Sequence, residues 1–414
     1  MTPTDPGCHE SGNLSISAAQ QILRDTVRAL EPVPLPVTAA LHRVSAATLR
    51  AQTDLPPFDQ SAVDGYAVRA ADIAAAPCTL PLAGTVAAAP QATMPQLPPG
   101  HAVRIFTGGL LPDGTDTVVR QELTEAADGA VRVQRPLEPG VDLRRRGEEL
   151  SAGTAIIEPG RRLHAGIIGA LAAAGVAIVS VRRSPRIRVL VTGDELVPLG
   201  GEAGRGQIFD SNGPLVSAWL SAAGYADVSL RSVPDDEGAV RAALESGFRE
   251  ADLVISTGGV SVGDRDLLPP TAAALGARQL FWKVSQKPGK PLYAAIRDNS
   301  LFLGLPGNPG AVLINLAVFV RLALDLMEGV ADAGPPMAAG CLAADVRGDR
   351  FRDSWLRARR SIDGDGRVLL HPLGRQASHM LSNLSDADCL ALLPAREGGW
   401  AAGTTVRWLP LTSA

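Results

Sequence analysis

The chain has 414 residues, of which 46% are hydrophobic and 20% are charged, a length that predicts two to four globular domains. Its 39 basic and 43 acidic side chains give a net charge of −4, which excludes the basic footprint of a nucleic-acid-binding protein. The four cysteines are far apart in the sequence, which excludes a zinc finger or a dithiol motif. We find no signal peptide and no apolar run of membrane-spanning length, so we expect a cytoplasmic protein with reduced thiols and no membrane partner.

The first region of the chain predicts an elongated mixed α/β segment that is interrupted by another domain. Residues 1–45 and 150–180 carry helical and strand patterns, whereas the residues between them have a different composition. We therefore expect 1–45 and 150–180 to pack together. The expected elements are helices at 17–30, 38–50 and 163–174 and a strand at 176–181.

Residues 46–149 predict an inserted, mostly β domain. Short β-type segments, among them 103–106 and 118–119, are separated by Pro and Gly. The turn at Asp64 and the end of the strand before Thr107 are its most distinctive features.

Residues 181–329 alternate apolar strands with helices, which predicts a doubly wound, parallel α/β domain. Residues 330–414 return to short β segments and predict a C-terminal β domain. The strands expected in the α/β domain are 187–191, 228–233, 253–255, 279–284, 292–296 and 300–304, and its helices are 214–223, 238–250, 268–275 and 309–327. The C-terminal strands expected are 356–362, 368–371, 390–393 and 405–408.

Three acidic residues follow apolar strands of the predicted α/β domain. They are Glu195, Asp235 and Asp266, and the last of them follows the glycine pair Gly258 and Gly259. Because the carboxyl ends of parallel strands meet at one edge of the sheet, we expect the three carboxylates to converge there. Clustered carboxylates repel one another unless a cation joins them, and oxygen ligands favour Mg²⁺. The alternative is an ordinary glycine-rich turn with surface acids.

The only lysines of the chain are Lys283, Lys287 and Lys290, while every other basic side chain except the histidines is an arginine. A compact ammonium group is not replaceable by a guanidinium, so we interpret this loop as an anion-binding segment, with a solvated charge cluster as the alternative. A helix starting at Asn308-Pro309 would present main-chain N–H groups to the same anion. An anion-binding wall opposite a carboxylate wall favours phosphoryl or nucleotidyl chemistry. The chain has no P-loop, and the absence of a G-x-S-x-G motif argues against a hydrolase.

Taken together, the motifs resemble the molybdopterin molybdenumtransferase family, which includes the MoeA proteins and the gephyrin E domain. The matching blocks occur in family order from about residue 50 to residue 394. They are PPFDQSAVDGYAVR, RIFTGGLLPDGTDTVVRQE, DLRRRGEE, VTGDEL, GQIFDSN, DLVISTGGVSVGDRD, WKVSQKPGKP, GLPGNPGA and GRQASHMLSNLSDADCLALLP. Three positions depart from the family pattern: Glu149, Ala377 and Gly310.

This resemblance implies an enzyme that takes adenylylated molybdopterin and molybdate, releases AMP and inserts molybdenum with the help of Mg²⁺. It also implies a homodimer, and a possible partner is the adenylyltransferase of the same pathway. The implied catalytic positions are Asp64, Thr107, Glu195, Asp235, Asp266, Lys283 and Lys287, with Mg²⁺ at Glu195, Asp235 and Asp266. The implied substrate-binding positions are Gly258, Gly259, Ser261, Lys290, Pro306, Gly307, Asn308, Arg357 and Ser378.

Two other functions share parts of this pattern. One is an adenylyltransferase that acts one step earlier on the same cofactor, and the domains that flank the α/β unit argue against it. The other is a non-catalytic scaffold, and the retained acids and lysines argue against it.

Overall fold

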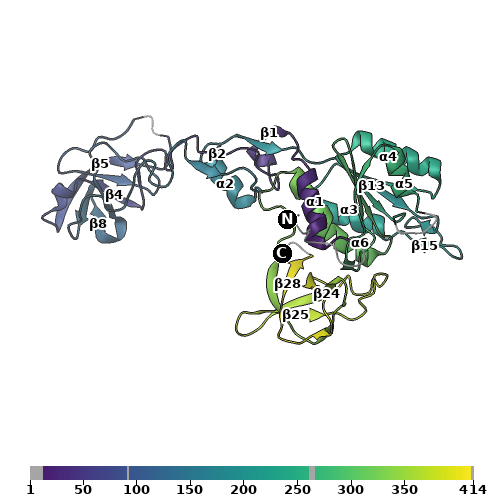
Figure 1. Cartoon of the computed structure of the whole chain (residues 1–414). Coiled ribbons are helices and arrows are strands. Elements are labelled where there is room, and N and C mark those ends of the chain that lie inside the picture. Colours follow the sequence, from purple (N-terminus) through teal and green to yellow (C-terminus); the bar gives the residue numbers. More distant parts are fainter. Residues whose placement is uncertain (1–12, 91–92, 261–265, 412–414) are drawn as a thin grey trace, which may run out of the picture.

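The protein is an elongated molecule with an α/β multidomain fold, as predicted (Figure 1). The computed structural model describes residues 13–90, 93–260 and 266–411. The inserted β domain forms one end, and the α/β domain lies beside the C-terminal β domain at the other end. A narrow middle segment, which carries β1 (Pro32–Pro36) and α2 (Ala165–Ala173), connects them.

Two antiparallel strand pairs hold the middle segment together. β1 pairs with β12 (Ile178–Arg182), and β2 (Leu49–Arg50) pairs with β11 (Ala155–Ile157). The helix predicted at 38–50 is wrong, because only the 3-10 turn η1 (Val37–Ala39) forms there before the chain bridges to the returning segment. By this pairing, Leu49 and Arg50 lie with the middle segment rather than with the inserted domain in which we placed them.

The first helix, α1 (Ile16–Thr26), is shorter than the predicted 17–30. It begins after Ser15, whose hydroxyl accepts a hydrogen bond from the N–H of Ala18 at 3.1 Å, and ends before Val27, whose backbone is extended. Its buried side chains, Ile16 and Leu23, belong to the core of the α/β domain. The N-terminal helix therefore packs on that domain and not in the middle segment.

The inserted domain contains one six-stranded sheet in the order β7-β4-β6-β5-β9-β8. A separate two-stranded pair, β3 (Gln60–Ser61) with β10 (Leu143–Arg144), lies where the chain enters and leaves this domain. The strands of the sheet are β4 (Gly65–Val68), β5 (Cys78–Val86), β6 (Ala102–Ile105), β7 (Thr117–Arg120), β8 (Thr124–Ala127) and β9 (Ala130–Val133).

The α/β domain is built on a six-stranded sheet in the order β16-β13-β17-β21-β20-β18. Its strands are β13 (Ile187–Thr192), β16 (Val228–Val233), β17 (Leu253–Thr257), β18 (Arg278–Trp282), β20 (Tyr293–Arg297) and β21 (Ser300–Leu305). The first four strands in this order are parallel, but β20 runs antiparallel to both of its neighbours. The predicted parallel arrangement is confirmed for β16, β13, β17 and β21. β20 runs the other way, because a tight hairpin with Asp298 at φ 54° joins it to β21.

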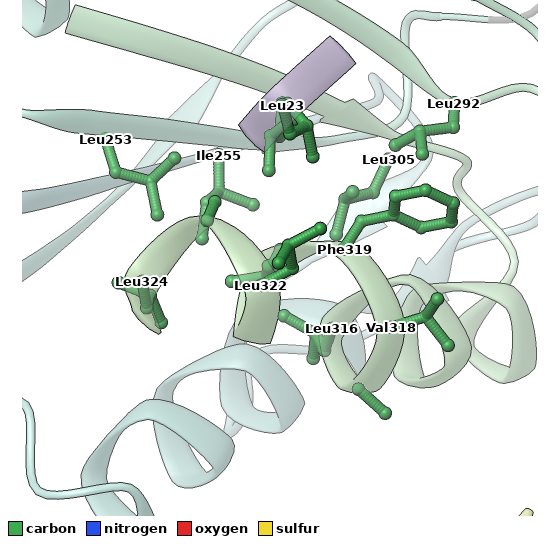
Figure 2. Packing of buried hydrophobic residues seen from close by; sticks show 14 of the residues in the cluster. Leu23, Leu253, Ile255, Leu292, Leu305, Leu316, Val318, Phe319, Leu322 and Leu324 are labelled. Atoms are coloured by element: carbon green, nitrogen blue, oxygen red, sulfur yellow. The ribbon is translucent and has the colours of Figure 1, made fainter. Parts of the chain in front are cut away.

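Helices cover both faces of this sheet. α1, α3 (Asn212–Ala222), α6 (Pro309–Asn315) and α7 (Arg321–Met327) contribute to one apolar core, while α4 (Glu237–Glu250) and α5 (Leu268–Ala274) contribute to the other. Figure 2 shows Leu253 and Ile255 of β17 beside Leu322 and Leu324 of α7, and all four belong to one buried cluster. Burying each such side chain contributes about 1.5–3 kcal/mol.

One stretch contradicts the prediction that no apolar run reaches membrane-spanning length. Residues 309–327 form 19 consecutive helical residues with a mean hydropathy of 1.9, in which the π-helical turn η4 (Leu316–Val320) separates α6 from α7. However, 89% of this stretch is buried inside the protein. It is therefore packed as the central helix of the α/β core.

The C-terminal domain is built on a third six-stranded sheet, and one of its strands comes from the α/β domain. β19 (Gln286–Lys287), in the lysine loop, pairs in parallel with β24 (Asp353–Ile362). This pairing attaches the lysine loop to the C-terminal domain. The other strands of the domain are β22 (Ala338–Leu342), β25 (Val368–Pro372), β26 (Cys389–Leu393) and β28 (Thr405–Pro410), with the separate pair β23 (Val346–Arg347) and β27 (Gly399–Trp400).

Candidate functional site

A cavity of about 750 Å³ lies at the carboxyl ends of the parallel strands, where α/β proteins bind their ligands. Its walls come from the loops after β13, β16, β17 and β21, from β15 (Ile208–Phe209), and from His379 and Leu381 of the C-terminal domain. We call it the larger cavity, to distinguish it from a smaller one described below. The predicted site residues that line it are Glu195, Asp235, Gly258, Gly259, Asp266, Pro306, Gly307 and Asn308.

Two glycines are required where β17 turns into the cavity wall. Gly258 has φ +90°, and a Cβ there would lie 2.8 Å from the carbonyl oxygen of Thr192. Gly259 has φ +66°, and its Cβ would lie 2.8 Å from the side chain of Leu268. Any other residue would be strained in this conformation and would collide with a neighbour. The turn therefore lets main-chain atoms form the wall.

Asn308 precedes α6 but does not cap it with its side chain. Its Nδ2 instead donates to Oγ of Ser378 at 3.0 Å, and the N–H of Gly310 donates to the carbonyl oxygen of Ser378 at 3.1 Å. One of the N–H groups that we expected to face an anion is thus used to hold the C-terminal domain. The contact brings Ser378, from another domain, to the start of α6, as the site prediction requires.

The three acids share one cavity without forming a preassembled metal centre. Within the described residues, no group of three or more His, Cys, Asp or Glu side chains is close enough to hold a metal. Asp235 also has a structural role, since its N–H donates to Asp194 Oδ1 at 3.0 Å and thereby connects the loops after β13 and β16. Such a wall fits Mg²⁺ held by one or two carboxylates together with substrate phosphates, the usual mode for this ion.

A smaller cavity of about 360 Å³ adjoins the first and shares Pro291, Pro306 and Asn308 with it. Its basic groups are Lys287, Lys290 and Arg352. We did not predict Arg352, although its place just before β24, which pairs with the lysine loop, could have indicated it. Ser378 also lines this smaller cavity, which makes it suitable for an oxyanion.

Asp349 restrains two of these cations. Its carboxylate lies 3.4 Å from Nζ of Lys287 and 2.9 Å from a guanidinium nitrogen of Arg352. Burial raises the pKa of Asp349, but hydrogen bonds from the N–H of Phe351 and from Arg352 outweigh that effect and hold the pKa at about 2. The carboxylate thus stays charged and orients both cations near neutral pH.

Arg357, which we expected to bind phosphate, is buried and engaged with the main chain. Its guanidinium donates to the carbonyl oxygens of Met380, Arg375 and Ala377 at 2.7, 3.0 and 3.0 Å. It lines neither the larger nor the smaller cavity. Arg357 therefore shapes the loop that carries Ser378, and Arg352 is the arginine that faces the smaller cavity.

Lys283 is also outside both cavities. It adopts φ 73°, and its ammonium group lies 5.2 Å from the centre of the Trp282 ring. Ser261, the remaining loop residue of the prediction, lies outside the described residues.

Asp64 and Thr107 form a second, distant feature in the inserted domain. Asp64 Oδ1 accepts hydrogen bonds from both the N–H and the hydroxyl of Thr107, each at 2.8 Å. These bonds, the main-chain one first, lower the pKa of Asp64. Because the inserted domain and the α/β domain occupy opposite ends of the molecule, this pair does not meet the cavities within one chain (Figure 1).

Three family models match successive parts of the chain. Residues 14–175 match the MoeA N-terminal region (domain I and II), residues 188–325 match a probable molybdopterin binding domain, and residues 339–411 match the MoeA C-terminal region (domain IV).

Curated relatives match over nearly the whole chain. A molybdopterin molybdenumtransferase of Haemophilus influenzae is 33% identical and covers 91% of this chain and 95% of its own length. One from Nostoc is 35% identical over 90% of this chain and 87% of its own length. A crystal structure of a molybdopterin biosynthesis MoeA protein from Pyrococcus horikoshii has a TM-score of 0.80 at 26% identity, covering 97% of this chain and 100% of its own. The chain therefore belongs to the molybdopterin molybdenumtransferase family, that of the MoeA proteins.

Proposed function

We propose that this protein takes adenylylated molybdopterin and molybdate, inserts molybdenum at the dithiolene and releases AMP. One observation carries the proposal: a cavity with carboxylates on its wall opens beside a smaller cavity lined by Lys287, Lys290 and Arg352. A volume of about 750 Å³ suits a substrate composed of a nucleotide and a pterin. The family membership supports the same chemistry.

The residues divide the work by charge. Lys287, Lys290 and Arg352 would neutralise the oxyanion that enters the smaller cavity, with Asp349 orienting two of them. One or two of the carboxylates of Glu195, Asp235 and Asp266, together with phosphate oxygens of the substrate, would hold Mg²⁺, which when bound supplies positive charge to those oxygens. Catalysis of this kind rests on positioning and on charge neutralisation rather than on a covalent nucleophile.

We also propose a homodimer in the cytoplasm as the active form. Asp64 and Thr107 lie in the inserted domain, at the opposite end of the molecule from the cavities (Figure 1). If these two residues act on the substrate, a second copy must supply them. The adenylyltransferase of the same pathway is the partner that would deliver the substrate.

A turnover experiment tests this function. Purified protein is incubated with adenylylated molybdopterin, molybdate and Mg²⁺, and released AMP is measured by chromatography. We expect AMP release that depends on both molybdate and Mg²⁺. Formation of adenylylated molybdopterin from molybdopterin and ATP would instead indicate an adenylyltransferase. Undiminished molybdoenzyme activity after deletion of the gene would indicate a scaffold.

A further inference from the structure

The side chain of Asn212 leaves a hydrogen-bond acceptor unused at the wall of the larger cavity. Asn212 is the first residue of α3, is 6% exposed and lies on the cavity wall. Its Nδ2 donates to the carbonyl oxygen of Gly307 at 2.7 Å. This bond fixes the amide orientation, because a flipped amide would place two acceptors against each other. Among the described residues, nothing donates to the buried Oδ1.

A buried acceptor without a donor destabilises the protein, so Oδ1 favours a ligand that brings an N–H or O–H group. The acceptor therefore selects for a donor at one place in the cavity.

Two large apolar side chains of the cavity wall lack cover. Phe209, three residues before Asn212, is 49% exposed, and Leu381 of the C-terminal domain is 41% exposed. Both line the same cavity as Asn212. β15 supplies Phe209, whereas the loop held by Arg357 supplies Leu381, so the two come from different domains. An exposed aromatic side chain in a cavity with both polar and apolar walls suits a flat ring that stacks on it.

We infer that Asn212 and Phe209 recognise a fused heteroaromatic ring that carries an amino group. The ring would stack on Phe209 and donate an N–H to Asn212 Oδ1, while Leu381 covers the ring from the C-terminal domain. This inference rests on the proposed function, since both the adenine and the pterin of adenylylated molybdopterin have this chemistry. The other possible occupant of Oδ1 is a water molecule, in which case the site would not distinguish amino from oxo rings.

Binding measurements without turnover test the inference by calorimetry. The probes are AMP, inosine monophosphate, which has an oxo group in place of the amine, and ribose 5-phosphate, which has no nucleobase. Neopterin and its 2-oxo (lumazine) analogue form the pterin arm. We expect the protein to prefer the amino ring over its oxo analogue about tenfold in one of the two arms. That arm identifies which ring occupies the site.

Two variants assign the preference to residues. Asn212→Ala should abolish the amino-over-oxo preference, and because the preference is a ratio within one variant, a general loss of stability does not mimic the effect. Phe209→Ala should weaken binding of the preferred ring on the order of tenfold or more. If adenine is that ring, binding of ribose 5-phosphate should stay unchanged. Ser221→Ala, on the exposed face of α3, is the matched control.

The outcomes separate this inference from the proposed function. Equal affinity for amino and oxo rings in both arms, no binding of either ring, or an unchanged preference in Asn212→Ala would overturn the inference even if AMP release from the full substrate is normal. Conversely, an Asn212-dependent preference without molybdate-dependent AMP release would support the ring site and remove the proposed reaction.

Discussion

Asp266 is the acid whose charge should matter most for the reaction, since it lies on the cavity wall just after the mandatory glycine turn. We predict that Asp266→Asn, which keeps the shape and removes the charge, lowers molybdate-dependent AMP release on the order of a hundredfold or more. The melting temperature should stay close to that of the wild type.

The matched control for this change is Asp128→Asn. Asp128 is exposed on a turn of the inserted domain with φ 51°, a conformation that Asn tolerates as well as Asp does. Both variants are assayed under the same conditions. Full activity in Asp266→Asn would show that the carboxylate is dispensable and would remove the acid wall from the mechanism.

Lys287 allows a test of the lysine loop at constant charge. It lines the smaller cavity and contacts Asp349 at 3.4 Å, a geometry that suits a compact ammonium group. We predict that Lys287→Arg raises the KM for molybdate about tenfold, because the longer, planar group cannot occupy the same position. Steady-state kinetics measure this, with exposed Arg367→Lys as the reverse control. An unchanged KM would mean that the survival of lysine here is accidental.

At the scale of elements, a buried ion-pair network joins the middle segment to the α/β core. Arg162 donates to Asp325 at 2.9 Å and to Glu328 at 2.7 Å, and both carboxylates are nearly fully buried on the last helical stretch. The hydroxyl of Tyr225 donates to Glu328 at 2.8 Å. Burial lowers the pKa of Arg162, but the charge of Glu328 and the other acid raise it by more.

We predict that Arg162→Met lowers the free energy of unfolding by about 3 kcal/mol, because it leaves buried carboxylates short of a partner. Adding Glu328→Gln to that variant should restore part of the loss. Urea denaturation followed by tryptophan fluorescence measures both effects. Arg161→Met, an exposed neighbour, serves as the control. A loss of equal size in Arg161→Met would argue against the network as the cause.

Elements defined by local patterns were predictable from the sequence, whereas those defined by distant pairing were not. The strand at 228–233 has the predicted bounds, since its limits follow from its own apolar residues and flanking turns. The segment 38–50 also has helical spacing, yet its strand pairing with residues 155–157 decides its structure. Likewise, the reversal of β20 depends on a hairpin turn that apolar periodicity does not reveal.

The same distinction applies to the site. The position of Glu195, Asp235 and Asp266 at one cavity followed from strand ends alone. The choice between Arg352 and Arg357 did not, because it depends on which way each side chain leaves β24 or the turn before it. The buried acceptor of Asn212 likewise becomes visible only when Gly307 is placed beside it.

At the scale of the whole molecule, the elongated shape separates two groups of functional residues. The inserted domain carries Asp64 and Thr107 at one end, and the cavities lie at the other (Figure 1). The network around Arg162 fixes the middle segment, to which the inserted domain is attached, to the α/β domain. A rigid connection of this kind suits the proposed homodimer, in which the inserted domain would reach a defined place on a second copy.

Mixing two inactive variants tests whether the site is shared between subunits. We predict that Asp64→Asn and Asp266→Asn are each inactive alone, and that dimers reassembled from an equal mixture recover about a quarter of the wild-type activity. Random assortment makes about half of the dimers mixed, and each mixed dimer has one intact site and one doubly altered site. Molybdate-dependent AMP release reports the recovery. If both residues act within one chain, no mixed dimer contains an intact site, and the mixture stays inactive.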